Sequence, residues 1–212
     1  MRVFEYVPRE EWKPVRREIV EIISSVRKLL KPKFTFSFAF IGSSHRGLIT
    51  REINGNRGYD FDVDLRVNDE EEKYSADELK HMFMQAFDSI SWQYGYRPCE
   101  DSKSVITMKR VDEFNSRILY GCDFAIVNNY FDKKGNPRQQ YIFFDKENTE
   151  YLWFERSKEY CRLKEKEERI KEAGAWSVVR TVYLNKKCRF SYQKKSRALY
   201  AETINEVFMS LN

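Results

Sequence analysis

The sequence has few of the residues that usually build zinc, redox and disulfide sites. Only two of its 212 residues are histidines, and its four cysteines lie far apart without a CxxC spacing. These features exclude a histidine-rich metal site and argue against a zinc site or a disulfide framework. We therefore expect the cysteines to be plain buried residues of a protein in a reducing, cytoplasmic location.

Long apolar stretches are also missing. No stretch approaches the roughly 18 consecutive apolar residues that a membrane-spanning helix needs, and the first residues lack the apolar centre of a secretory signal. The hydrophobic share of 42% is nevertheless enough for the core of one domain, or of one domain with a small appendage. We expect no membrane partner, and the sequence leaves the oligomeric state open.

Charge is distributed unevenly along the chain. The whole sequence has a net charge of +5, but residues 156–197 contain 14 Lys and Arg against 5 Asp and Glu, so the remainder is net acidic. This polarity indicates an acidic metal site in one part of the chain and basic residues that meet a polyanion in another. The alternative interpretation is that helices rich in lysine and glutamate simply have solvated faces.

The pattern of apolar residues predicts an α+β fold. Helical spacing or alternating apolar residues predict helices at 10–30, 75–90, 149–172, 175–190 and 196–211, and strands at 34–41, 59–67, 104–111, 117–127 and 140–144. This order favours a mixed β-sheet with helices packed on it in residues 1–145. Residues 146–212 are predicted to form a C-terminal helical region that packs on this core.

The segment that organises the chain runs from Phe38 to Val67 and ends in a run with an aspartate at every second position. In a strand, this spacing puts Asp60, Asp62 and Asp64 on one face and the apolar residues between them on the other, where a core would lie. Three like charges side by side repel one another. The pattern therefore predicts a divalent metal, Mg²⁺ or Mn²⁺, bound together with a nucleotide triphosphate.

A glycine-serine turn precedes the aspartates. Gly42 lets the backbone come close to a ligand, and the hydroxyl and N–H groups of Ser43 and Ser44 can hold phosphate oxygens. The loop that follows, residues 45–59, carries three arginines and three glycines. Its length favours a functional or mobile loop over a tight connection.

Asp123 is a lone carboxylate in an otherwise apolar predicted strand, which is a poor place for an unpaired charge. If this strand neighbours the aspartate strand, its carboxylate joins those of Asp62 and Asp64. Carboxylates at i and i+2 lie about 6.6 Å apart along a strand, so they can flank two metal ions about 3.5–4 Å apart, as nucleotidyl transfer requires. The third carboxylate would complete one metal site and orient or deprotonate the attacking hydroxyl.

Taken together, these motifs resemble the nucleotidyltransferase superfamily that includes DNA polymerase beta. The resemblance rests on Gly42-Ser43 after a strand, Asp62-Val63-Asp64 between apolar residues, and Asp123 on a later strand. It covers about residues 10–130. It implies that Asp62, Asp64 and Asp123 are the catalytic metal ligands and that Gly42 and Ser43 hold the phosphates of a nucleoside triphosphate.

The resemblance implies an enzyme that moves a nucleoside monophosphate from the triphosphate to a hydroxyl and releases pyrophosphate. The acceptor stays open between a nucleotide, an RNA end, a small molecule and a protein hydroxyl. Lys158 and Arg162, one helical turn apart in a predicted helix, can both face the triphosphate, although a solvated face is the alternative.

One departure from the family pattern is the distance between the two motifs. The 18 residues between Ser43 and Asp62 are more than is common in the family, and this insert can reshape the acceptor site or mark an inactive member. Two other functions therefore stay open. One is a glycosyltransferase that uses an Asp-x-Asp pair to bind a metal and a nucleotide sugar; the other is a degenerate module that binds nucleotide or RNA without turnover.

Overall fold

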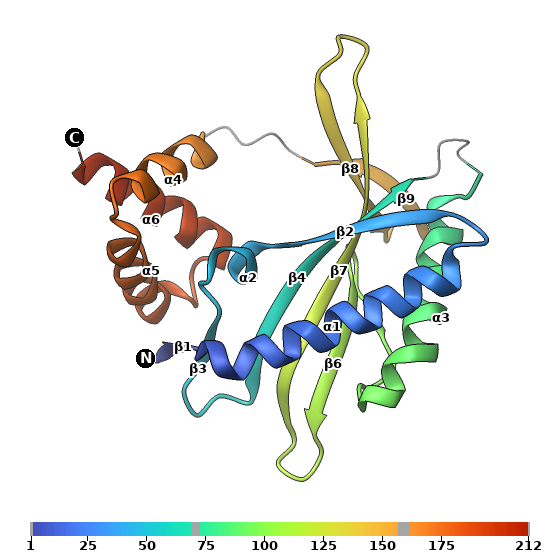
Figure 1. The fold of residues 1–212 in the computed structure, drawn as a ribbon, viewed down its shortest axis with the longest axis horizontal. Helices are drawn as coiled ribbons and strands as arrows, with labels where there is room; N and C mark the ends of the chain where they lie inside the picture. The colour runs from blue at the N-terminus through green and yellow to red at the C-terminus, as the bar shows by residue number, and fades with distance from the viewer. Residues whose placement is uncertain (1, 69–72, 157–161, 212) are drawn as a thin grey trace. The chain divides into compact units, whose positions relative to one another are not determined.

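The computed structural model describes residues 2–68, 73–156 and 162–211 (Figure 1). Contacts divide the chain into two compact units, each built from segments that are separate in the sequence. None of the helices in this described part of the chain combines the length and the apolar character needed to cross a membrane.

The larger unit, residues 7–49 and 56–156, is built on a seven-stranded sheet. Its strands are β2 (Thr35–Ile41), β4 (Arg57–Asn68), β5 (Glu100–Asp101), β6 (Ile106–Asp112), β7 (Arg117–Phe131), β8 (Pro137–Asp145) and β9 (Glu150–Glu155). The order is β2-β4-β7-β6-β5, and β8 and β9 extend the sheet from the second half of β7. Among the described strands of this sheet, β4 and β7 pair in parallel and the other pairs are antiparallel, so the predicted mixed sheet is confirmed.

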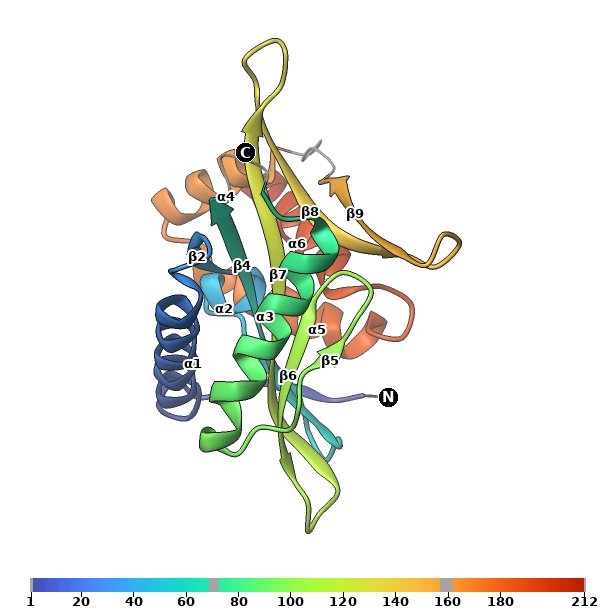
Figure 2. The ribbon, with the colours of Figure 1, turned by 90° about the vertical axis from the view of Figure 1, so that its right-hand side faces the viewer.

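Helices α1 (Arg9–Leu30) and α3 (Ala76–Ser91) pack against each other and cover one face of this sheet (Figures 1 and 2). The apolar residues of the aspartate strand point toward them, because Phe61, Val63 and Leu65 are fully buried in the same hydrophobic cluster as the helices. The predicted alternation of the aspartate strand is therefore confirmed, and its aspartates lie on the opposite face of the sheet.

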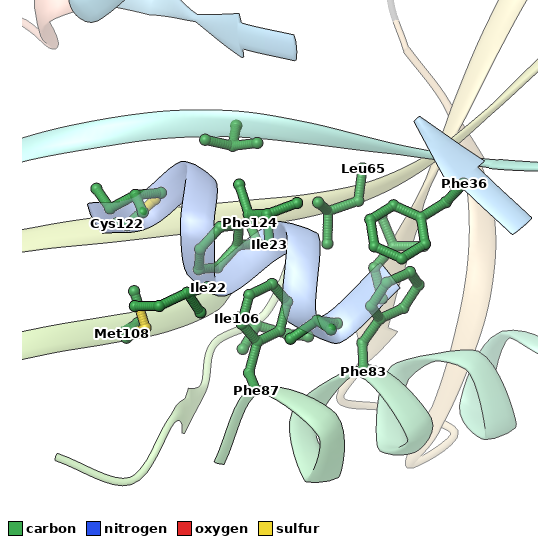
Figure 3. Close-up of a cluster of buried hydrophobic side chains, with 14 of the residues drawn as sticks. Ile22, Ile23, Phe36, Leu65, Phe83, Phe87, Ile106, Met108, Cys122 and Phe124 are labelled. Atoms are coloured by element: carbon green, nitrogen blue, oxygen red, sulfur yellow. The ribbon is translucent and has the colours of Figure 1, made fainter. Parts of the chain in front are cut away.

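Aromatic side chains fill much of this core, as Figure 3 shows for its central part. Phe87 of α3 stacks on Phe124 of β7 with ring centroids 4.2 Å apart, and Phe83 contacts Phe36 of β2 edge to face at 5.0 Å. Cys122 is also buried here. These contacts fix β2, β4 and β7 against one rigid layer, which holds the opposite face of the sheet in place.

The smaller unit contains the described residues of segments 1–6, 50–55 and 157–212. Its elements are β1 (Phe4–Tyr6), β3 (Thr50–Glu52), α4 (Leu163–Glu172), α5 (Trp176–Phe190) and α6 (Ser196–Ser210). Strands β1 and β3 pair antiparallel, and the Tyr6 hydroxyl donates a hydrogen bond to the Arg180 carbonyl of α5.

The predicted helix over residues 149–172 is wrong in its first part. Residues Glu150–Glu155 form strand β9, which pairs antiparallel with β8, and a helix begins only at Leu163. The aromatic residues Tyr151, Trp153 and Phe154 favour a strand over a helix, and cross-strand pairing with Phe144 and Ile142 reinforces that preference. Strand β9 lies beyond residue 145 and belongs to the unit that contains the sheet.

Candidate active site

The parallel pairing of β4 and β7 brings two of the predicted aspartates side by side. Asp62 lies directly opposite Asp123 in the register, and Asp64 lies opposite Ala125. Paired residues of neighbouring strands point to the same side of a sheet, so Asp62, Asp64 and Asp123 share the face away from α1 and α3. The prediction that the Asp123 strand neighbours the aspartate strand is confirmed.

The turn after β2 lies against Asp62. Gly42 begins a short helix, α2 (Gly42–Arg46), with a φ of +62°, and a Cβ at this position would collide with the Asp62 carboxylate. Ile41, the last residue of β2, is paired with Asp62. Only glycine combines this backbone conformation with so close an approach to a carboxylate.

The two serines of the turn have different surroundings. Ser44 is buried, and its hydroxyl donates to the Ile41 carbonyl at 3.0 Å, so this side chain fixes the turn. Ser43 is partly exposed, and its carbonyl accepts a hydrogen bond from the Leu48 N–H at 2.9 Å. Of the two, Ser43 is therefore the one whose side chain keeps access to solvent.

Asp64 forms an ion pair that the sequence did not reveal. The Nη1 and Nη2 atoms of Arg156 lie 2.9 and 3.0 Å from the two carboxylate oxygens of Asp64, one on each. The Asp64 side chain is only 4% exposed, whereas that of Arg156 is 31% exposed. A guanidinium that binds both oxygens in parallel gives a strong, geometrically defined pair.

Asp123 is held by a hydroxyl from the strand on its other side. Thr107 of β6 is its cross-strand neighbour, and Thr107 Oγ1 donates to Asp123 Oδ1 at 2.7 Å. Burial raises the pKa of the Asp123 carboxyl, while this hydrogen bond and the positive charge of Lys109 oppose the rise. The hydrogen bond from Thr107 thus orients the partly buried side chain of Asp123.

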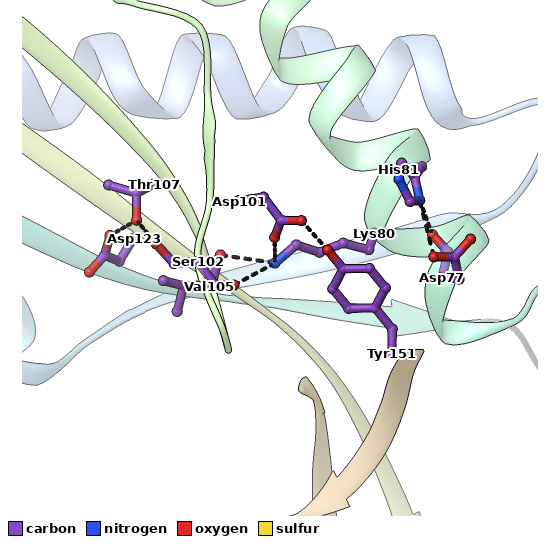
Figure 4. A network of polar contacts seen from close by, with 9 residues as sticks. All are labelled: Asp77, Lys80, His81, Asp101, Ser102, Val105, Thr107, Asp123 and Tyr151. Carbon is purple, nitrogen blue, oxygen red and sulfur yellow. Dashed lines mark hydrogen bonds and ion pairs between the residues drawn. The ribbon is translucent and has the colours of Figure 1, made fainter. Parts of the chain in front are cut away.

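Figure 4 shows that Thr107 belongs to a longer polar network. The hydroxyls of Thr107 and Ser102 lie 3.2 Å apart, and Lys80 Nζ donates to the Ser102 carbonyl at 3.2 Å and pairs with Asp101 at 3.0 Å. Lys80 is almost completely buried, and this burial lowers its pKa although Asp101 opposes the shift. The network fixes the segment before β6 against α3 and so limits the movement of Thr107.

If Asp123 acts in catalysis, we expect Thr107→Val to lower the rate by about threefold to tenfold, because a hydrogen bond contributes about 0.5–1.5 kcal/mol net. Valine keeps the volume and the β-branched shape but cannot orient Asp123. Thr107→Ser restores the hydroxyl and should recover most of the rate. Equal losses in both variants, measured with thermal unfolding as a check on folding, would show that the site is sensitive to any change of this side chain and would contradict a role of the hydroxyl alone.

The other predicted residues lie in different places. Asp60 is exposed, and its carboxylate lies so close to Gly121 that a Cβ there would be 2.7 Å from Asp60 Oδ1. Arg162 is in the smaller unit, immediately before α4, and pairs with Glu165 at 3.8 Å. Lys158 lies outside the described residues. The predicted role of Lys158 and Arg162 in binding a triphosphate stays a prediction.

The donor set fits a hard divalent cation in its chemistry. Mg²⁺ is bound by a few carboxylates and completes its coordination with phosphate and water oxygens, and three aspartates on two adjacent strands supply such carboxylates. Among the described residues, no three His, Cys, Asp or Glu side chains converge as a ready-made metal site. Arg156 supplies the positive charge at Asp64 instead.

Aromatic side chains extend the same face beyond the aspartates. Val127 lies four residues after Asp123 on β7, so the two side chains share a face of the sheet. Val127 pairs with Tyr141 of β8, and Tyr141 pairs with Phe154 of β9. Phe143 lies next to Phe154, with ring centroids 5.5 Å apart, and Phe154 is 54% exposed. We call Tyr141, Phe143 and Phe154 the aromatic face.

The fold itself is found in solved structures. The chain aligns with the cyclic AMP-GMP synthase DncV of Vibrio cholerae at a TM-score of 0.62, with 13% identity over 97% of this chain and 68% of that one. It also aligns with the CdnE c-di-GMP synthase of Capnocytophaga granulosa at a TM-score of 0.58, with 14% identity over 95% and 61%. These synthases belong to the nucleotidyltransferase superfamily. The chain has the nucleotidyltransferase fold.

This nucleotidyltransferase fold confirms the fold that the sequence motifs implied. A second DncV structure, in complex with GTP, aligns at a TM-score of 0.60 with 14% identity over 90% of this chain and 53% of that one. The chain thus spans 53% of the length of this structure and 61% of the length of the CdnE synthase. No family model and no curated protein matches the sequence.

Two side chains of this nucleotidyltransferase fold were missed from the sequence. Thr107 is one of several alternating residues in a predicted strand, and its role depends on pairing with Asp123. Arg156 stands two residues after Phe154, within the segment 149–172 that was predicted as a helix, and is separated from Asp64 by 92 residues. Both follow from strand pairing, which no local pattern encodes.

Proposed function

We propose that the chain is a metal-dependent nucleotidyltransferase that transfers a nucleoside monophosphate from a nucleoside triphosphate to a hydroxyl. The observation that supports this most directly is the register of β4 and β7, which aligns Asp62 with Asp123 beside the Gly42 turn. Carboxylates on adjacent strands next to a close-approach turn suit a triphosphate with its cations. The fold agrees with this chemistry.

In the proposed reaction, the acceptor hydroxyl attacks the α-phosphorus of the triphosphate. A new bond forms between the acceptor oxygen and that phosphorus, the bond to the bridging oxygen of the β-phosphate breaks, and pyrophosphate leaves. Asp123, half-buried and with a raised pKa, orients the hydroxyl and accepts its proton. Asp62 lies beside Gly42 and would hold the cations that accompany the triphosphate.

Mg²⁺ or Mn²⁺ bound by Asp62, Asp64 and Asp123 would neutralise the triphosphate and stabilise the charge that develops during transfer. The turn of Gly42 and Ser43, both partly exposed, would hold phosphate oxygens through its backbone N–H groups and the Ser43 hydroxyl. Ser44 supports the turn through its bond to Ile41. Lys158 and Arg162 remain candidates for the outer phosphates.

For the acceptor we favour a nucleotide hydroxyl. The neighbouring structures are synthases of cyclic dinucleotides, and the aromatic face lies on the same side of the sheet as Asp123. Exposed aromatic rings bind nucleobases by stacking, largely independently of the base.

We expect Phe154→Ala to raise the KM of a nucleotide acceptor by about tenfold, because stacking of a base on one aromatic ring is worth about 1–3 kcal/mol. The control is Phe114→Ala, which removes a 96% exposed ring from the β6–β7 turn. The two variants should unfold at similar temperatures. An unchanged KM in Phe154→Ala would contradict a nucleobase on this face.

The function is tested by incubating the protein with Mg²⁺ or Mn²⁺, each α-labelled triphosphate in turn and a panel of nucleotide acceptors. Release of pyrophosphate with transfer of the label supports the proposal. Metal-dependent triphosphate binding without transfer would instead identify a degenerate binding module. Turnover of a nucleotide sugar in the same assay would favour the glycosyltransferase alternative, which the nucleotidyltransferase fold makes the weaker one.

A further inference from the structure

The ion pair between Asp64 and Arg156 occupies a carboxylate that the proposed function assigns to a metal ion. Both oxygens of Asp64 face the guanidinium, at 2.9 and 3.0 Å. The Asp64 side chain is 4% exposed. A divalent cation that approaches Asp64 is therefore repelled at short range by the positive charge of the Arg156 guanidinium.

The backbone of Arg156 is held by strand pairing, whereas its side chain is partly exposed to solvent. Its N–H donates to the Gln139 carbonyl at 2.8 Å and continues the β8–β9 pairing by one residue. Its side chain is 31% exposed, and the Cζ atom lies 6.0 Å from the centre of the Tyr141 ring. A rotation about side-chain bonds can thus take the guanidinium from Asp64 toward solvent while β9 stays paired.

The partner that would attract Arg156 away from Asp64 is a phosphate group. A guanidinium binds the oxygens of phosphate in the same two-point geometry as those of a carboxylate. Arg156 stands on the face that carries Asp62 and Asp123, where the proposed function puts the triphosphate. Binding of the triphosphate would therefore supply a new partner for Arg156 and leave Asp64 to a cation.

We propose that Arg156 gates the metal site: it holds Asp64 in the nucleotide-free protein and passes to the triphosphate when the nucleotide binds. The inference rests on the proposed function, because it needs Asp64 to be a metal ligand. Cation and nucleotide then bind with positive coupling. When only a minor fraction of the molecules has Asp64 free of Arg156, the apparent affinity of the protein for the cation is reduced in proportion to that fraction.

The test measures Mn²⁺ binding by electron paramagnetic resonance, which needs no turnover. We expect the wild type to bind Mn²⁺ weakly alone and at least about tenfold more tightly with a non-hydrolysable triphosphate analogue. A tenfold difference corresponds to Arg156 holding Asp64 in about nine-tenths of the nucleotide-free molecules. Arg156→Gln should bind Mn²⁺ about tenfold more tightly than the wild type without nucleotide, and Arg156→Lys should lie between the two.

Two control variants separate this effect from general changes in charge. Arg138→Gln removes another arginine of the β8–β9 hairpin, one that pairs with Asp132 at 2.9 Å and Glu155 at 3.2 Å, and should leave Mn²⁺ binding unchanged. The double variant D64N/R156Q should lose the gain, because the gain acts through Asp64. Thermal unfolding confirms that each variant is folded.

The outcomes distinguish the inference from the function on which it rests. Equal Mn²⁺ affinity in the wild type, Arg156→Gln and Arg156→Lys, with nucleotidyl transfer retained in the wild type, would make Arg156 a structural partner of Asp64 and overturn the gate alone. Absence of Mn²⁺ binding in every variant, with and without the triphosphate analogue, would overturn the gate together with the metal-dependent function.

Discussion

Asp62→Asn is expected to lower the rate of the proposed nucleotidyl transfer by about a thousandfold, the largest loss that we predict for a single side chain. Asparagine keeps the size and shape of the side chain but removes the negative charge that the proposed cation site needs. Removing one electrostatic contact to a transition state costs about 10²–10³ in rate, and a carboxylate that binds a metal lies at the upper end. Label transfer from an α-labelled triphosphate measures the loss.

Asp60→Asn is the matched control for this experiment. Asp60 stands two residues earlier on the same face of β4, but it is exposed and lies over Gly121. The same change of charge on the same strand should therefore cost little activity. Comparable losses in Asp60→Asn and Asp62→Asn would mean that the negative potential of the face matters, and that Asp62 has no individual role.

The positions of the aspartates in the candidate site could be predicted because they depend on local patterns in the sequence. Alternation of aspartates with buried residues defines the two faces of β4, and the structure puts Phe61, Val63 and Leu65 in the core as expected. Asp123 could be singled out as a lone charge in an apolar strand, because burying a carboxylate costs free energy unless it is paired or hydrogen-bonded. The fold class follows from the same patterns, because layers of helix and sheet are dictated by which face is apolar.

The remaining features depend on pairings between distant segments. Strand β9 was predicted as a helix. The sequence therefore did not predict that Arg156 directly follows an extended strand. The contact of Arg156 with Asp64 needs β7, β8 and β9 to be paired in one register. Likewise, the segment 50–55 belongs with the smaller unit although it lies between β2 and β4 in the sequence.

The second large effect is expected for Gly42→Ala. Alanine in the left-handed conformation of Gly42, with a φ of +62°, costs about 1–2 kcal/mol of stability. The larger consequence is local, because the added Cβ collides with the Asp62 carboxylate and moves it. A displacement of about 1 Å at reacting groups can cost about a hundredfold in rate, and we expect a loss of that size in label transfer.

Gly47→Ala separates the two effects, because Gly47 ends the same short helix with a φ of +68° and has no atom within 4 Å of the position that a Cβ would take. It should show a similar loss in thermal stability and nearly full activity. Equal activity losses in Gly42→Ala and Gly47→Ala would mean that the turn acts through its conformation alone. A loss confined to Gly42→Ala would mean that the turn and the aspartate strand act together. It would support the proposal that the space left by the missing side chain of Gly42 lets Asp62 meet the triphosphate.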